Sequence, residues 1–152
     1  MQTLTDVCYR DGCDWVSLCF PFALNFYRTM STGEFIRAEG GKKVLAGQAF
    51  VPEVYYNREY YPICGHHFWD SKDGATTVCK ALGFTTGTLK NWPKQSSNEA
   101  YTKDAMAVGL CKPGEQFTHC SGGGNGWGDL DFNGGSCKKG KHVKIEVICD
   151  GK

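Results

Sequence analysis

The alternation of apolar and polar side chains predicts several short β-strands. Residues 49–56 and 59–64 are rich in valine and tyrosine and flank Asn57-Arg58, which is typical of a β-hairpin. Pro52 and Pro62 are expected to place these strands at sheet edges or bulges, because proline cannot donate a ladder hydrogen bond. Residues 103–111 predict a further short strand. Every second position of residues 143–149 is apolar, so the last strand is expected to bury one face.

A change of period predicts one helix over residues 70–82. Apolar side chains recur there at three- and four-residue spacing, at Ala75, Val78, Cys79 and Leu82. Asp70 or Ser71 is expected to cap the start of this helix, and Gly83 stands where a left-handed C-cap belongs. One short helix among several short strands predicts an α+β domain.

Length, charge and cysteine content narrow the class of protein. The 152 residues fit one domain of ordinary size. The 17 basic and 16 acidic side chains leave a net charge of +1, which argues against a nucleic-acid binder. No apolar run approaches the roughly 20 residues needed to span a bilayer. The nine cysteines have wide, irregular spacings without a C-x2-C motif, which favours disulfides and an extracellular, secreted or surface-attached protein.

Residues 1–33 differ from residues 34–152 in their sequence pattern. The first segment carries Cys8, Cys13 and Cys19 beside an aromatic patch at Phe20–Tyr27, and Ser31–Gly33 is expected to be a hinge. If the other six cysteines pair among themselves, one of these three is left over, which suggests a bond to another molecule or a reactive free cysteine. The segment is therefore expected to be an interaction arm. The alternative is a disulfide-pinned extension with one buried thiol.

The six remaining cysteines permit 15 pairings, which sequence alone does not decide. Their surroundings include Tyr61-Pro62-Ile63-Cys64, Phe68-Trp69-Asp70 and a helix that ends Val78-Cys79-Lys80-Ala81-Leu82-Gly83-Phe84. Further landmarks follow in order at Cys111–Glu115, Cys120, Gly126-Trp127-Gly128, Cys137 and Val147-Ile148-Cys149. In these features residues 35–151 resemble the scavenger receptor cysteine-rich (SRCR) domain, in its six-cysteine variety.

This resemblance implies a curved antiparallel sheet that cradles one short helix. It also implies the disulfides Cys64–Cys137, Cys79–Cys149 and Cys111–Cys120. The pairing is physically coherent, because Cys79 lies on the apolar face of the expected helix and Cys149 on the apolar face of the last strand. A bridge that closes a loop of some 70 residues stabilises a protein by about 4 kcal/mol in the chain-entropy model.

Two metal sites are considered. Some SRCR domains bind calcium through two aspartates and a glutamate, and only the glutamate is matched here, by Glu115. His66-His67 stand in place of the aspartates. These histidines could bind a softer metal together with Glu115 or Asp70. The opening half of a calcium loop is matched by Asp129, Asp131 and Asn133, which Gly134 follows. The simpler interpretation of this loop is a mobile glycine-rich segment with solvated carboxylates.

A basic cluster follows this loop, at Lys138, Lys139, Lys141 and Lys144. It is either a ligand-binding surface for anions or a solvated face. Catalysis is not expected, because no nucleophile elbow or marked carboxylate pair is present. The sequence therefore predicts a non-enzymatic binding module for a protein or polyanionic ligand. The alternative is a structural subunit of a secreted filament, matrix or surface assembly, linked to neighbouring copies through the N-terminal arm.

Overall fold

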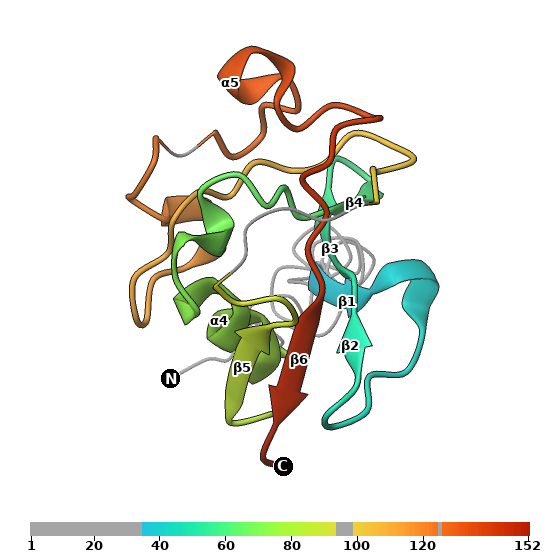
Figure 1. Cartoon of the computed structure of the whole chain (residues 1–152), viewed down its shortest axis with the longest axis vertical. Coiled ribbons are helices and arrows are strands. Elements are labelled where there is room, and N and C mark those ends of the chain that lie inside the picture. Colours follow the sequence, from blue (N-terminus) through green and yellow to red (C-terminus); the bar gives the residue numbers. More distant parts are fainter. Residues whose placement is uncertain (1–34, 94–98, 125) are drawn as a thin grey trace, which may run out of the picture. The chain divides into compact units, whose positions relative to one another are not determined.

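The computed structural model of the protein describes residues 35–93, 99–124 and 126–152 (Figure 1). The chain divides into two units, Met1–Met30 and Ser31–Lys152, and all described residues belong to the second unit. The arm expected for residues 1–33, with Cys8, Cys13 and Cys19, lies outside the described residues. Within the described part, no helix is long and apolar enough to cross a membrane.

The first sheet contains the predicted hairpin. It consists of β1 (Ile36–Ala38), β3 (Pro52–Tyr56) and β4 (Glu59–Pro62) in the antiparallel order β1-β3-β4. Asn57 and Arg58 have φ angles of 46° and 68°, and a type I′ hairpin turn requires such positive values at both central positions. The edge placement expected from Pro52 was wrong, because β3 is the central strand. Pro52 is tolerated there as the first residue of the strand.

The second sheet consists of β2 (Ala49–Phe50), β6 (Val147–Asp150) and β5 (Thr86–Leu89) in the antiparallel order β2-β6-β5. The described residues thus form two three-stranded antiparallel sheets instead of one curved sheet. Only Val51 separates β2 from β3, so one extended segment supplies a strand to each sheet. Pro52 follows directly and has no amide hydrogen for a ladder, which is consistent with the change of partner at this point.

Helix α4 (Asp73–Ala81) is the predicted helix, but it begins three residues later than expected. A 3-10 turn, η2 (Phe68–Asp70), occupies the start of the predicted range, and the Ser71 hydroxyl accepts a hydrogen bond from the Asp73 amide at 3.2 Å. The predicted C-cap is confirmed. Gly83 has φ 86°, its amide bonds the Lys80 carbonyl at 3.1 Å, and the Phe84 amide bonds the Cys79 carbonyl at 2.9 Å. These two bonds form a Schellman motif.

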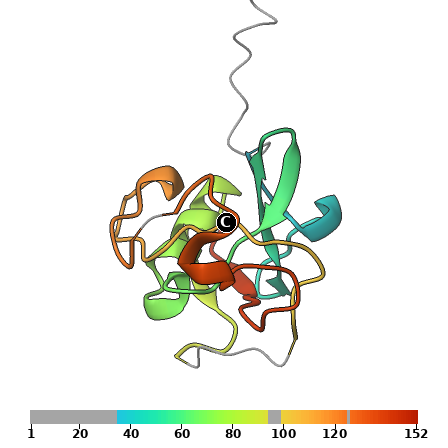
Figure 2. The same cartoon turned by 90° about the horizontal axis from the view of Figure 1, so that it is seen from above.

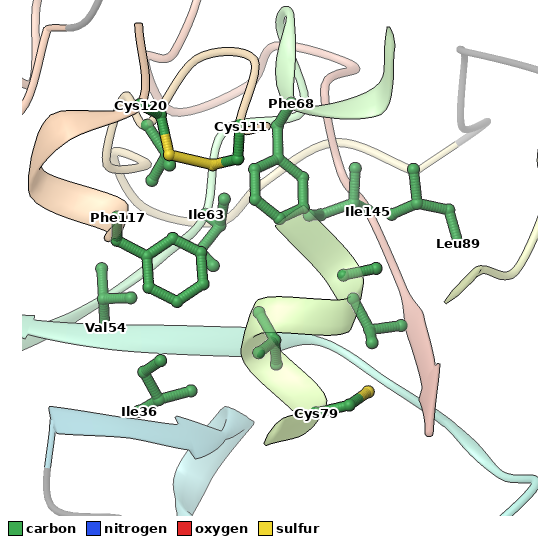
Figure 3. Close-up of a cluster of buried hydrophobic side chains, with 14 of the residues drawn as sticks. Ile36, Val54, Ile63, Phe68, Cys79, Leu89, Cys111, Phe117, Cys120 and Ile145 are labelled. Carbon is green, nitrogen blue, oxygen red and sulfur yellow. A yellow bond between two sulfur atoms is a disulfide. The ribbon is translucent and has the colours of Figure 1, made fainter. Parts of the chain in front are cut away.

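The core lies where both sheets meet the apolar stripe of α4. Figure 3 shows side chains from both sheets and the loops around this helix, with the Cys111–Cys120 disulfide near Phe68 and Phe117. The contact between α4 and β5 is close. A Cβ atom at Gly87 would lie 2.5 Å from the Ala75 carbonyl oxygen and 2.5 Å from the Cys79 sulfur. Glycine at this position therefore permits the approach of helix and sheet.

Of two further predicted strands, the one over residues 103–111 does not form and the last one is shorter than expected. Residues 103–111 form only isolated bridges, Ile63 with Met106 and Leu110 with Gly122, and Gly109 has φ 83°, which interrupts extended backbone. Strand β6 is Val147–Asp150, so it contains only residues 147–149 of the predicted 143–149. The preceding residues bond to loops, since the Val143 carbonyl accepts from the Gly65 amide at 2.9 Å and the Ile145 amide donates to the Tyr101 hydroxyl at 3.1 Å.

Candidate binding surface

Three disulfides fix the loops of the described unit. The bonded pairs are Cys64–Cys137, Cys79–Cys149 and Cys111–Cys120, and their Cα–Cα distances are 5.4, 5.3 and 4.5 Å, respectively. These are the pairs that the resemblance implies, and all six cysteines are buried. Cys64–Cys137 joins the end of the hairpin segment to the segment that follows the short helix α5 (Phe132–Gly135). This bridge therefore holds the bases of two loop regions together.

The turn at residues 65–70 and the loops at 121–144 meet in the structure. The Gly65 amide bonds the Val143 carbonyl at 2.9 Å. Gly123 approaches the ring of His67 so closely that a Cβ atom on the glycine would lie 2.4 Å from it. Segments more than 50 residues apart in sequence therefore form one continuous loop surface. In the view of Figure 2 this part of the molecule, with α5 in front, is distinct from the green β3–β4 hairpin.

The glycine-rich segment is anchored by its tryptophan. The ring of Trp127 lies 5.6 Å from that of Phe35 and 6.1 Å from that of Tyr56, measured between centroids. The Gly128 amide lies 3.4 Å from the Met106 sulfur, and Gly128 has φ 87°, a conformation that favours glycine. Trp127 thus packs against the rings of Phe35, which directly precedes β1, and Tyr56, the last residue of β3, and these contacts fix one end of the segment.

Two of the four lysines in the basic cluster are paired. The Lys138 ammonium lies 3.4 Å from the Asp104 carboxylate and 3.6 Å from that of Asp131. The Lys144 ammonium lies 2.5 Å from the Glu99 carboxylate. Hydrogen bonds to these carboxylates raise the pKa of both lysines. Sequence reasoning missed Asp104 and Glu99 as partners, because each lies more than 30 residues from its lysine and no local spacing reveals the pair.

The other two lysines of the cluster differ, because the described residues show no ion pair for them. Lys139 and Lys141 are exposed, and neither ammonium forms an ion pair with any residue that the structure describes. The Lys139 backbone amide donates to the Asp104 carboxylate at 2.9 Å, and this bond is the main cause of the lowered pKa of Asp104. The backbone at Lys139 is thereby held in place while its side chain faces solvent.

The residues of the expected calcium loop lead into α5, since Asp129 and Asp131 precede the helix and Asn133 and Gly134 lie within it. The Asp129 carboxylate accepts the Asp131 amide at 2.8 Å, and the Asp131 carbonyl accepts the Gly135 amide at 3.1 Å. Both aspartates are exposed, and the side chain of Asn133 lies outside the described residues. In the described part no three His, Cys, Asp or Glu side chains are grouped so that they could hold a metal ion. The calcium site remains a prediction.

Protein groups contact the side chains of the other expected metal site, which are His66, His67 and Glu115. The rings of His66 and His67 are 4.2 Å apart, and His67 Nδ1 lies 3.0 Å from the Asp70 carboxylate. Burial lowers the pKa of His66, and His67 adds to this effect. Glu115 accepts hydrogen bonds from the Lys112 amide at 2.8 Å and the Ser121 hydroxyl at 2.8 Å. Its carboxylate therefore closes the loop that the Cys111–Cys120 disulfide spans.

Two hollows were not foreseen from the sequence. One of about 540 Å³ lies between α4 and residues 113–118, and it combines apolar walls with a rim of threonines and charged groups. Another of about 300 Å³ is bordered by Lys42, Lys43 and Lys152. Comparisons of the chain with protein-family models, with curated proteins and with solved structures each found no match.

Proposed function

We propose that the chain is an extracellular, non-enzymatic binding module of SRCR type that recognises a protein or polyanionic ligand. The observation that carries this proposal is the joined loop surface, made of residues 65–70 and residues 121–144. Its backbone contacts and the Cys64–Cys137 disulfide hold these loops together. Disulfide-fixed loops suit recognition, because little conformational entropy is lost when a ligand binds them. Three buried disulfides are also compatible with an oxidising, extracellular location.

Anion recognition by this surface would depend on Lys139 and Lys141. Their ammonium groups are exposed, whereas those of Lys138 and Lys144 already bond carboxylates. A polyanion gains affinity when it replaces the counterions around exposed cations, so each lysine that it contacts adds to the salt dependence of binding. The cluster therefore acts as two available cations and two that mainly order the loop.

The test is binding of dextran sulfate to the full oxidised chain over a range of salt concentrations. The double variant Lys139→Gln/Lys141→Gln is expected to reduce the slope of log affinity against log salt by about one to two. The double variant Lys72→Gln/Lys112→Gln removes the same charge at two exposed sites elsewhere and is the matched control. Binding that does not depend on salt, or equal slopes for the two variants, would reject polyanion recognition by this surface.

One observation favours the structural subunit as a second candidate. The six cysteines of residues 35–152 are paired with one another, so Cys8, Cys13 and Cys19 have no partner among them. Because three is an odd number, at least one of these three cysteines has no partner within residues 1–152. Sedimentation with and without reductant tests this candidate: a reduction-sensitive oligomer supports the assembly subunit, and a monomer under both conditions rejects it.

A further inference from the structure

We infer that the 300 Å³ hollow beside Lys42 and Lys43 binds a small organic anion. This site is separate from the joined loop surface. Figure 1 shows α5 at the opposite end of the unit from the C-terminal end of β6, where Lys152 follows. The inference therefore goes beyond the proposed function and depends on other residues.

The pairing of β6 with its neighbours brings three separate segments to this hollow. The Gly47 amide bonds the Cys149 carbonyl at 2.9 Å, which ties the loop before β2 to the end of β6. The Thr85 amide bonds the Asp150 carbonyl at 3.2 Å, which ties the turn after α4 to the same strand. One end of the fold consequently contains residues 42–44, the C-cap of α4 and Lys152.

Apolar groups line the hollow beneath these segments. They come from β1, from Val44 and from the helix C-cap, where Leu82 and Phe84 contribute. The left-handed Gly83 returns the chain so that Phe84 packs against the core and is only 5% exposed. The Lys152 ammonium lies 4.9 Å from the centroid of the Phe84 ring. A cation is thus held directly over an apolar surface.

The charged side chains that border the hollow are all basic. Arg37, Lys42, Lys43 and Lys152 border it, and no Asp or Glu does. Arg37 is compensated, because its Nε lies 2.8 Å from the Glu53 carboxylate. Among the residues that the structure describes, the three lysines form no ion pair. This differs from the cluster at residues 138–144, where acidic side chains already bond two of the four ammonium groups.

These properties define a class of ligand. A volume of about 300 Å³ is at the lower limit for small-molecule sites. It accommodates a single ring system or a short chain. The apolar lining would cover such a body, and the lysines would bind a carboxylate, sulfate, sulfonate or phosphate group attached to it. A compound with both parts is expected to bind more tightly than either part alone.

The test uses 1-naphthalenesulfonate as the probe and follows backbone amide shifts of the full oxidised chain by NMR. Saturable shifts are expected at residues 42–44 and 82–84. The neutral 1-naphthalenemethanol and inorganic sulfate, at the same concentration, separate the contributions of ring and charge. The variant Lys42→Gln/Lys43→Gln is expected to weaken probe binding about fivefold or more. Lys72→Gln/Lys112→Gln, with the same change of net charge at exposed positions, is expected to leave the affinity unchanged.

Localised shifts with the sulfonate alone, together with weaker binding of the Lys42→Gln/Lys43→Gln variant, would support the inference. Equal binding of the neutral alcohol would indicate only an apolar contact, and equal binding of sulfate only a simple anion site. Shifts centred elsewhere, or the same loss of affinity in both double variants, would show that bulk charge attracts the probe. Each of these four results would overturn the inference.

Discussion

Replacing the Cys79–Cys149 disulfide with two alanines should destabilise the protein more than the same change at Cys111–Cys120. The first bridge joins residues 70 apart in sequence and the second joins residues 9 apart. In the chain-entropy model, closing these loops in the unfolded chain is worth about 4.4 and about 2.6 kcal/mol. Both pairs are buried, with at most 1% exposure, so the alanine variants lose similar buried sulfur surface. The expected difference of about 1.8 kcal/mol therefore isolates loop length.

Equilibrium unfolding in urea measures this difference. The protein is purified without reductant, remaining free thiols are blocked, and tryptophan fluorescence follows unfolding. With slopes of about 1–3 kcal/mol per molar urea, the two midpoints should differ by about 1 M. An equal loss of stability in the two variants, or a larger loss at Cys111–Cys120, would refute the reasoning. The short bridge would then stabilise the fold through native contacts and not through loop closure.

Three further predictions concern single residues. Gly87→Ala should lower the free energy of unfolding by about 1–3 kcal/mol, because the new Cβ atom would overlap helix α4. The control Gly140→Ala, at φ 84° in open space, should lower it by about 1 kcal/mol. Midpoints of urea unfolding compare the two variants. Tyr101→Phe should cost about 1–3 kcal/mol in the same assay, since it leaves a buried carbonyl and a buried amide without their hydroxyl partner. The pKa of Glu115 is lowered, chiefly by the backbone amide that it accepts, so its contribution to loop order is present above pH 4.5 and is lost as pH falls through the lower folded pKa. Amide shifts of residues 112 and 121 should follow this titration, and Glu115→Gln should abolish it.

Local features of the fold could be predicted where one short stretch of sequence contains the whole interaction. The turn at Asn57-Arg58 is set by two positive φ angles, and the end of α4 is set by Gly83 and two backbone bonds. The start of the helix was misplaced because it was inferred from Asp70 and Ser71 as capping residues, whereas Asp70 ends a 3-10 turn and the helix begins at Asp73. The disulfide pairing could not be derived from spacing, and it was anticipated only through the resemblance of the surrounding residues.

The lysines of the candidate site could be predicted from the sequence, but their ion pairs could not. The sequence singled out the lysines at residues 138–144, whereas their ion pairs with Asp104 and Glu99 depend on segments brought close by tertiary folding. In the same way, nothing local indicates that Gly123 lies against the ring of His67.

By itself, then, the sequence determined the hairpin, the amphipathic helix with its C-cap, and the buried face of the last strand, because periodicity and turn chemistry act within a few residues. Tertiary structure alone decided that the strands divide into two sheets and that Val51 passes the chain from one to the other. It also decided which lysines remain available to a ligand. Strand pairing and ion pairing join residues far apart in the chain, and their energies exist only after the core has brought these residues together.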